Sequence, residues 1–316
     1  MLVCWFVFPP IHSLPNGMGL DYGLWSSLPS FLREGWGAFW FSFGCAGLAV
    51  YLLAELNNTN VLLRVSARTL SAAMALLLAV SVPCHQAQGP GCVLMVCSLL
   101  SFFPLFTTYQ LASPMHTFVA YLLLSAASLV FPKLLWLVPI YLHIQGYFRA
   151  LSFRCFLASI MATVLPYWFY GGVAVLTGTL DGFVSHVMTV VNVSGYEGLS
   201  LDGRDVLMFI FVVLTFILGS VDFYVNQYLD KTRVRIIYNA LIIHGIAMIV
   251  IILLQPQYFW TFLPILLVDT AVLFGHFFTL THTRFSHISC IVWALLAVVV
   301  VAAQYLCNEH LGFVLF

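Results

Sequence analysis

The residue best placed to carry chemistry is Asp269, near the middle of the apolar stretch Tyr258 to Leu280. A charged side chain at the centre of a bilayer costs about 2.5 to 3.5 kcal/mol, so it normally faces a partner or a water-filled cavity. His276 follows seven residues later, about 700° of helical rotation and about 10 Å of helix, so both side chains share one face. An acid and an imidazole in line at membrane depth are typical of a proton or cation path.

Three more polar residues fall at a depth similar to that of His276, each within or at the end of an apolar stretch. They are His244, His143 and Asp222. If their helices are neighbours, these side chains converge with His276 beneath Asp269. We therefore predict that the five residues form a coupling or substrate site.

The same residues also have a structural interpretation. Buried Asp and His side chains often serve only as hydrogen-bond partners between helices. Asp222 is close enough to the expected membrane interface to pair with Arg233 or Arg235 or to reach water. Packing and function both stay open for these side chains.

Signatures of other chemistry are missing from the sequence. It contains no HExxH metal motif and no Gly-x-Ser-x-Gly nucleophile motif, and its eight cysteines are not at zinc-binding spacing. We expect no catalytic residue, no metal site and no cofactor. Arg204 is a candidate for binding a ligand outside the membrane, and Cys84 and Cys92 flank a short loop where a disulfide would form in an oxidising compartment.

The composition explains why these polar residues stand out. Of 316 residues, 62% are hydrophobic and 7% are charged, whereas soluble domains are roughly 45–50% apolar and about 25% charged. Lipid must therefore be the solvent for most of the chain, and membrane lipids are its expected partners. The formal net charge of zero, without a long basic run, argues against nucleic acid as a partner.

Apolar stretches separated by Pro, Gly, Asn or charge predict an all-α, polytopic transmembrane bundle of about ten spans. We expect residues 1–34 to be an N-terminal stub with an external amphipathic segment. Residues 35–316 form the transmembrane domain, with one external segment at 177–204 in which Phe183 to Val191 lies in the interface. The predicted spans are Gly35 to Leu56, Thr69 to Cys84, Cys92 to Tyr109, Met115 to Phe131, Leu134 to Phe148, Cys155 to Leu176, Asp205 to Asn226, Ile236 to Leu254, Tyr258 to Leu280 and Ile288 to Leu306.

The basic residues predict the orientation, because short loops rich in Lys and Arg stay in the cytoplasm. Ten spans place eight basic residues inside: Arg64, Arg68, Arg149, Arg154, Lys231, Arg233, Arg235 and Arg284. Three fall outside: Arg33, Lys133 and Arg204. The segment 177–204 then faces the exterior or periplasm.

Three segments resemble uncharacterised multi-pass inner-membrane proteins of the Bacteroidetes. They are Tyr147 to Ser159, Leu254 to Phe259, and Gly275 to Phe285. The resemblance implies a bacterial inner membrane as the location and carries no activity.

Three functions remain open from the sequence. The leading hypothesis is a bacterial inner-membrane transporter or flippase-like carrier in which Asp269 with His276 handles a proton or polar substrate. The second is a noncatalytic scaffold subunit that binds other envelope membrane proteins in an assembly complex. The third is an enzyme acting on a lipid-linked saccharide, with Arg204 on its binding side.

Overall fold

A computed structural model shows a chain built of helices, with no strand among the residues that it describes. These are residues 23–25, 29–33, 35–63, 68–81, 90–192, 203–280 and 284–310. The α-helices are α2 (Ser30–Arg33), α3 (Gly35–Asn60), α4 (Arg68–Val80), α6 (Gly91–Thr107), α7 (Pro114–Val130), α8 (Leu137–Tyr147), α9 (Phe153–Thr177), α10 (Leu180–Val191), α11 (Gly203–Asn226), α12 (Thr232–Leu254), α13 (Phe259–Leu280) and α14 (Arg284–His310). Short 3-10 turns are η1 (Gly23–Trp25), η2 (Pro132–Trp136), η3 (Gln227–Leu229) and η4 (Pro256–Tyr258).

The ends of α9 follow from local chemistry. The Ser152 side chain accepts a hydrogen bond from the Cys155 backbone N–H at 3.3 Å, which caps the first turn. Gly178 ends the helix with φ of 72°, a left-handed conformation that costs glycine little. The chain can therefore reverse into α10 within a few residues.

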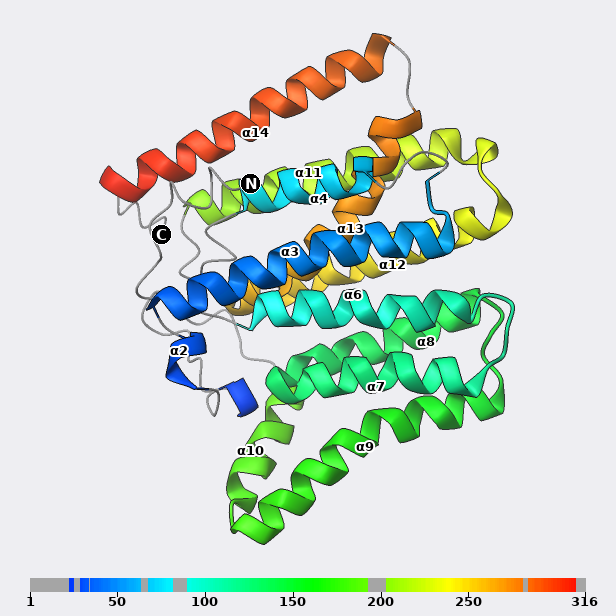
Figure 1. The fold of residues 1–316 in the computed structure, drawn as a ribbon, viewed down its shortest axis with the longest axis vertical. Helices are drawn as coiled ribbons and strands as arrows, with labels where there is room; N and C mark the ends of the chain where they lie inside the picture. Colours follow the sequence, from blue (N-terminus) through cyan, green and yellow to red (C-terminus); the bar gives the residue numbers. More distant parts are fainter. Residues whose placement is uncertain are drawn as a thin grey trace.

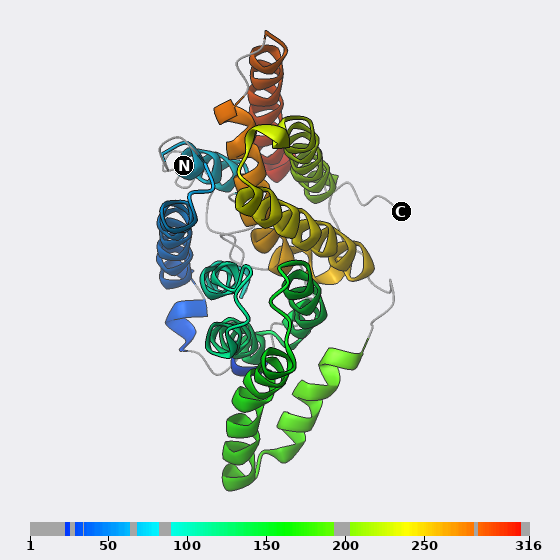
Figure 2. The ribbon, with the colours of Figure 1, turned by 90° about the vertical axis from the view of Figure 1, so that its right-hand side faces the viewer.

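The long helices lie side by side with their axes along one general direction (Figure 1). α14 lies at one edge of this array and α9 at the other, and the end-on view shows α10 diverging from α9 (Figure 2). α13 occupies the interior, where it packs against α4, α6, α11 and α12. Nearly every described side chain of α13 is buried, so this helix sets the surroundings of any group it carries.

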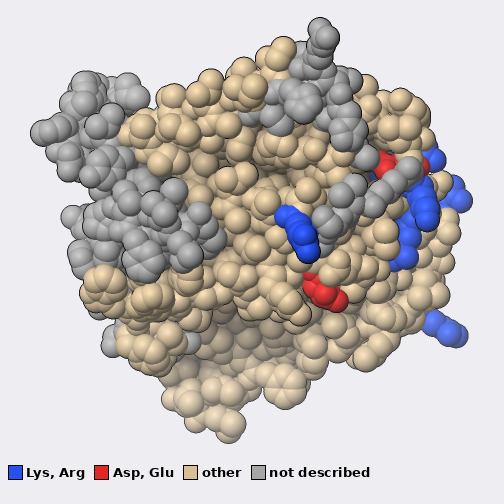
Figure 3. Space-filling view, turned by 45° about the horizontal axis from the view of Figure 1, so that its top comes forward, with Lys and Arg blue, Asp and Glu red and all other residues tan. Residues whose placement is uncertain are grey.

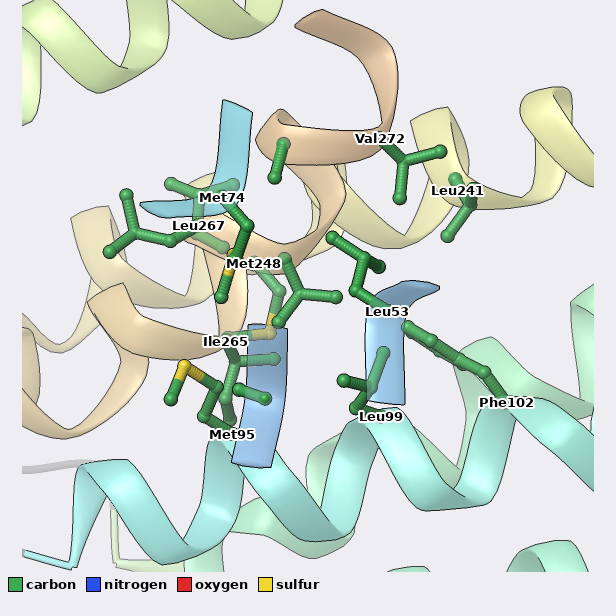
Figure 4. Packing of buried hydrophobic residues seen from close by; sticks show 14 of the residues in the cluster. Leu53, Met74, Met95, Leu99, Phe102, Leu241, Met248, Ile265, Leu267 and Val272 are labelled. Atoms are coloured by element: carbon green, nitrogen blue, oxygen red, sulfur yellow. The ribbon is translucent and has the colours of Figure 1, made fainter. Parts of the chain in front are cut away.

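The core around α13 is apolar and combines side chains from helices far apart in sequence (Figure 4). Ile265, Leu267 and Val272 of α13 belong to the same buried cluster as Leu53 of α3 and Phe102 of α6. Burying such side chains contributes about 1.5 to 3 kcal/mol each relative to water. Thr270 and Thr279 donate to backbone carbonyl groups of α13 itself, whereas a polar side chain that cannot do so must find its partner on a neighbouring helix.

The outer helices expose apolar side chains to their surroundings. On α9, Trp168 is 75% exposed and Leu176 is 88% exposed, and α11 and α14 show similar faces. Soluble monomers rarely expose continuous apolar surface of this extent. These faces suit contact with lipid.

Five helices within the described residues are long and apolar enough to cross a membrane, and these lie in α3, α9, α11, α12 and α13. α4, α6, α7 and α10 are apolar but shorter, as is the part of α14 at Ile291–Ala303. The chain is thus a helical protein compatible with a membrane. All ten apolar stretches predicted from the sequence are at least partly helical, with ends shifted by a few residues.

Some expectations shift or lie outside the described residues. The stretch Leu134 to Phe148 begins as the 3-10 turn η2 before α8 starts, and the segment 177–204, which the sequence predicts to be external, carries the 12-residue helix α10. Residues 1–22, and Cys84 with its expected link to Cys92, fall outside the part that the structure describes.

Basic side chains gather at one end of the helix array. On the face shown in Figure 3, most of the Lys and Arg atoms lie toward the right-hand end, and most of the remaining surface carries neither charge. The described segments at this end include the start of α9 and the link between α11 and α12, with Arg154, Lys231, Arg233 and Arg235. We call this the basic end.

Candidate functional site

His244 and Asp269 form a buried pair between two central helices. His244 lies near the middle of α12 and Asp269 near the middle of α13. The imidazole Nδ1 and the carboxyl Oδ2 are 2.7 Å apart, and both side chains are 0% exposed. The pair is therefore a fully buried hydrogen bond that joins the middle of α12 to the middle of α13.

Aromatic rings surround the imidazole. The Phe102 ring meets the His244 ring edge to face at 5.1 Å, and the Tyr141 ring lies at 5.9 Å. The Tyr141 hydroxyl shares a hydrogen bond of 2.6 Å with the Ser101 hydroxyl. The polar atoms Nε2 of His244 and Oδ1 of Asp269 are buried with no hydrogen-bond partner among the described residues. The pair thus keeps one unused polar atom on each side chain.

This arrangement has a defined chemical capacity. A neutral imidazole with a protonated carboxyl, or an imidazolium with a carboxylate, carries no net charge, and that neutrality makes burial tolerable. Gain of one proton makes the pair cationic and loss of one makes it anionic. The pair can therefore bind or release a proton, with a change in charge at the centre of the bundle.

A second polar cluster surrounds His276 nearer the basic end. Its Nε2 lies 2.9 Å from Oδ2 of Asp230, and its Nδ1 lies 3.7 Å from Oδ2 of Asp222. His276 is 0% exposed, while the Asp230 and Asp222 side chains are 3% and 10% exposed. The ring of Tyr238 packs against the imidazole at 4.9 Å. One imidazole thus lies between two carboxyl groups.

The structure separates the five predicted residues into three places. Asp269 pairs with His244, and His276 pairs with Asp222 in a different cluster. His143 is exposed on α8 and joins neither cluster. The expected convergence of the other four residues beneath Asp269 is not observed, because His244 lies level with Asp269 and pairs with it, while His276 is two helical turns away and contacts Asp222 and Asp230.

The predicted partners of Asp222 also differ from those observed. Its Oδ1 accepts a hydrogen bond from Asn226 at 2.8 Å, one turn further along α11. Arg233 donates to Asn60 and Arg235 to Thr232. These contacts leave Asp222 directed at His276.

Sequence reasoning missed Asp230, which lies in the basic link between α11 and α12. Its neighbours Lys231 and Arg233 predict an exposed basic loop there, so nothing in the sequence indicates that this carboxyl group turns inward. It is 7% exposed as a residue because η3 and the start of α12 fold it against α13. A contact between positions 46 residues apart carries no local signal.

Lys133 is also buried, although the sequence predicts that it lies in a loop on the outer side. It is 1% exposed, donates to the Asn192 carbonyl at 3.0 Å and to the Gln255 side-chain carbonyl, and lies over the Tyr258 ring at 4.3 Å. The ammonium group is compensated by these oxygens, by the aromatic face and by the negative end of the α10 dipole. Lys133 therefore fixes the end of α10 to the bundle.

The remaining predictions concern Arg204 and metal binding. The side chain of Arg204 lies outside the described residues. Among those that are described, no group of three His, Cys, Asp or Glu side chains is arranged to hold a metal ion.

Comparisons with protein-family models, with curated proteins and with solved structures find no match to this chain.

Proposed function

We propose that this chain is a proton-coupled membrane carrier in which His244 and Asp269 bind the coupling proton. The observation that carries the proposal is the 2.7 Å contact between two fully buried side chains at mid-helix, with one polar atom of each left without a hydrogen-bond partner. Carriers and pumps use Asp and His side chains at this depth as proton relays. α13, the most enclosed helix, carries the acid.

The proposal includes a topology of about ten spans in a bacterial inner membrane, with the basic end in the cytoplasm. The five long helices and the shorter apolar ones together supply the crossings, and the excess of Lys and Arg at one end favours that orientation. The resemblance to inner-membrane proteins of the Bacteroidetes supports the same location. A flippase-like carrier for a polar lipid falls within the proposal.

The second candidate function is a noncatalytic scaffold in an envelope-assembly complex. It is favoured by the fact that the His244–Asp269 hydrogen bond joins α12 to α13, which a structural role alone would explain. A scaffold requires no change in the protonation of the pair, so the two functions differ in a measurable property. The enzyme hypothesis rests on Arg204, for which no described contact offers support.

The test is a pH step applied to proteoliposomes on a solid-supported membrane. Protonation of a group inside the membrane moves charge, and the step should give a transient current that protein-free liposomes lack. Asp269→Asn keeps the shape of the side chain and removes its proton exchange, so it should remove most of the displaced charge. A solute that converts the transient into a sustained current, and fails to do so in Asp269→Asn, is the carried solute.

Glu55→Gln is the matched control, because it also neutralises a carboxyl group but does so near the end of α3, beside Asn58. Its current should equal that of the unsubstituted protein. An Asp269→Asn protein that folds and gives the same displaced charge as the unsubstituted protein would refute proton coupling and leave the scaffold function.

A further inference from the structure

We propose that Asp222, Asp230 and His276 form a second proton-binding site, which exchanges protons between water at the basic end and the His244–Asp269 pair. This inference rests on the proposed function, since it concerns the route by which the coupling proton arrives. It adds Asp230 to the chemistry and fixes the side of the bundle from which the pair is supplied.

The side chains of the cluster become less exposed toward the imidazole. Side-chain exposure falls from 10% at Asp222 to 3% at Asp230 and 0% at His276. Carboxyl groups that touch the surface exchange protons with water, and the buried imidazole contacts both of them. The cluster therefore has one accessible side and one enclosed side, as a relay requires.

His276 lies on the same helix as Asp269, nearer the basic end. The two residues are seven positions apart on α13, so they share one face with an axial separation of about 10 Å. His276 is on the basic side of Asp269. On α12, Tyr238 lies six residues before His244, and its ring packs against the imidazole of His276. Both α12 and α13 therefore carry one polar group at the level of His276 and one at the level of Asp269.

The two ring nitrogens of an imidazole allow it to pass a proton on. Neutral histidine accepts a proton at one ring nitrogen and releases the other proton from the opposite nitrogen, so it passes on a proton and returns to neutrality. Nε2 contacts Asp230, whereas Nδ1 has no hydrogen-bond partner among the described residues and lies 3.7 Å from Asp222. Transfer of a proton from the Asp230 carboxyl group to Nε2 is balanced by release of the proton on Nδ1, so the imidazole passes a proton on and returns to neutrality.

Acidic, phenolic and basic groups from several elements lie around the cluster. α11 contributes Asp222, the link before α12 contributes Asp230, and α12 contributes the Tyr238 hydroxyl, which is buried. The nearby guanidinium groups of Arg233 and Arg235 donate hydrogen bonds to Asn60 and Thr232. On α4, Arg68 is exposed at the first position of the helix. One carboxyl group therefore lies near each ring nitrogen of the imidazole.

The experiment separates the rate of proton uptake from its extent. Purified protein in detergent is mixed with weakly buffered solution at lower pH, and a soluble pH dye follows the protons consumed. For each protein, subtracting the trace of the same protein with Asp269→Asn added leaves the share that depends on the central pair. In His276→Gln we expect this share to reach the same final extent about tenfold or more slowly, because the relay is removed and the pair is retained.

Two further variants keep the test decisive. Asp222→Asn, at the surface side of the cluster, should slow the same phase, and it serves if His276→Gln does not fold. His143→Gln is the control, since this histidine is exposed on α8 and outside both clusters, and it should change neither rate nor extent.

The outcomes distinguish the two proposals. If Asp269→Asn takes up as many protons as the unsubstituted protein, the proton-coupled carrier itself is refuted. If Asp269→Asn loses uptake but the folded His276→Gln and Asp222→Asn proteins fill the pair at the unsubstituted rate, the carrier stands and the second site is refuted. Slow filling in either variant, with the extent unchanged, supports the second site.

Discussion

His186 illustrates how a single residue can make the stability of this molecule depend on pH. It lies in α10, which at 12 residues is too short to cross a membrane. The imidazole is 5% exposed, its ring centroid lies 5.4 Å from that of Tyr170, and neither nitrogen has a hydrogen-bond partner among the described residues. Burial lowers the pKa of His186 below its ordinary value of 6.5 because it penalises the charged imidazolium.

The lowered pKa predicts a loss of stability in acid. Below pH 6.5 the unfolded chain binds a proton on this residue before the folded chain does. The contribution of neutral His186 is therefore present above that pH and is lost as the pH falls through the lowered value. The thermal unfolding midpoint in detergent should fall with pH in this range, and less steeply in His186→Gln. Equal slopes for both proteins would show that this imidazole is not the cause.

At the scale of elements, the crossing of α11 and α13 depends on Gly219. A Cβ added there would lie 2.9 Å from the backbone carbonyl carbon of Leu273 and 2.9 Å from its Cβ. Backbone cannot move aside as a flexible side chain can. The small residue is what lets α11 approach α13 and bring Asp222 near His276.

Gly219→Ala should destabilise the protein by about 1 to 3 kcal/mol, because overpacking outweighs the gain of about 1 kcal/mol from replacing a helical glycine. Gly47→Ala on α3 is the matched control, since nothing lies within 4 Å of its added Cβ. That variant should be neutral or slightly stabilised. Unfolding midpoints of the two variants, measured side by side in one detergent, give the comparison, and equal midpoints would contradict the close crossing.

The positions of these helices along the chain can be predicted from the sequence, whereas which helix packs against which cannot. Long apolar runs predict helices, because lipid offers no hydrogen bonds to the backbone and the segment must satisfy its own. Residues such as Pro132 and Gly178 then mark where helices begin or end. Helical periodicity also places Asp269 and His276 on one face. The contact of Asp269 with His244 depends on which helix docks beside α13, and the inward turn of Asp230 depends on the fold of a link. Both are set by packing between distant segments.

At the scale of the whole molecule, the array of helices has two unlike ends. α9 begins at the basic end and, at 25 residues, is about 37 Å long, which exceeds the roughly 30 Å of bilayer hydrocarbon. Leu151 precedes this helix and Thr179 follows it, and both are exposed. If α9 crosses the membrane, the two positions must lie on opposite sides.

The excess of Lys and Arg predicts which side each position faces. With the basic end in the cytoplasm, Thr179→Cys should react with a membrane-impermeant maleimide in intact bacterial cells. Leu151→Cys should react only after the cells are permeabilised. The unsubstituted protein, which contains eight cysteines, sets the background for both. Reaction of Leu151→Cys alone in intact cells would invert the orientation, and with it the side from which Asp222 and His276 supply protons. Equal reaction of both positions in intact cells would show that α9 does not cross the membrane.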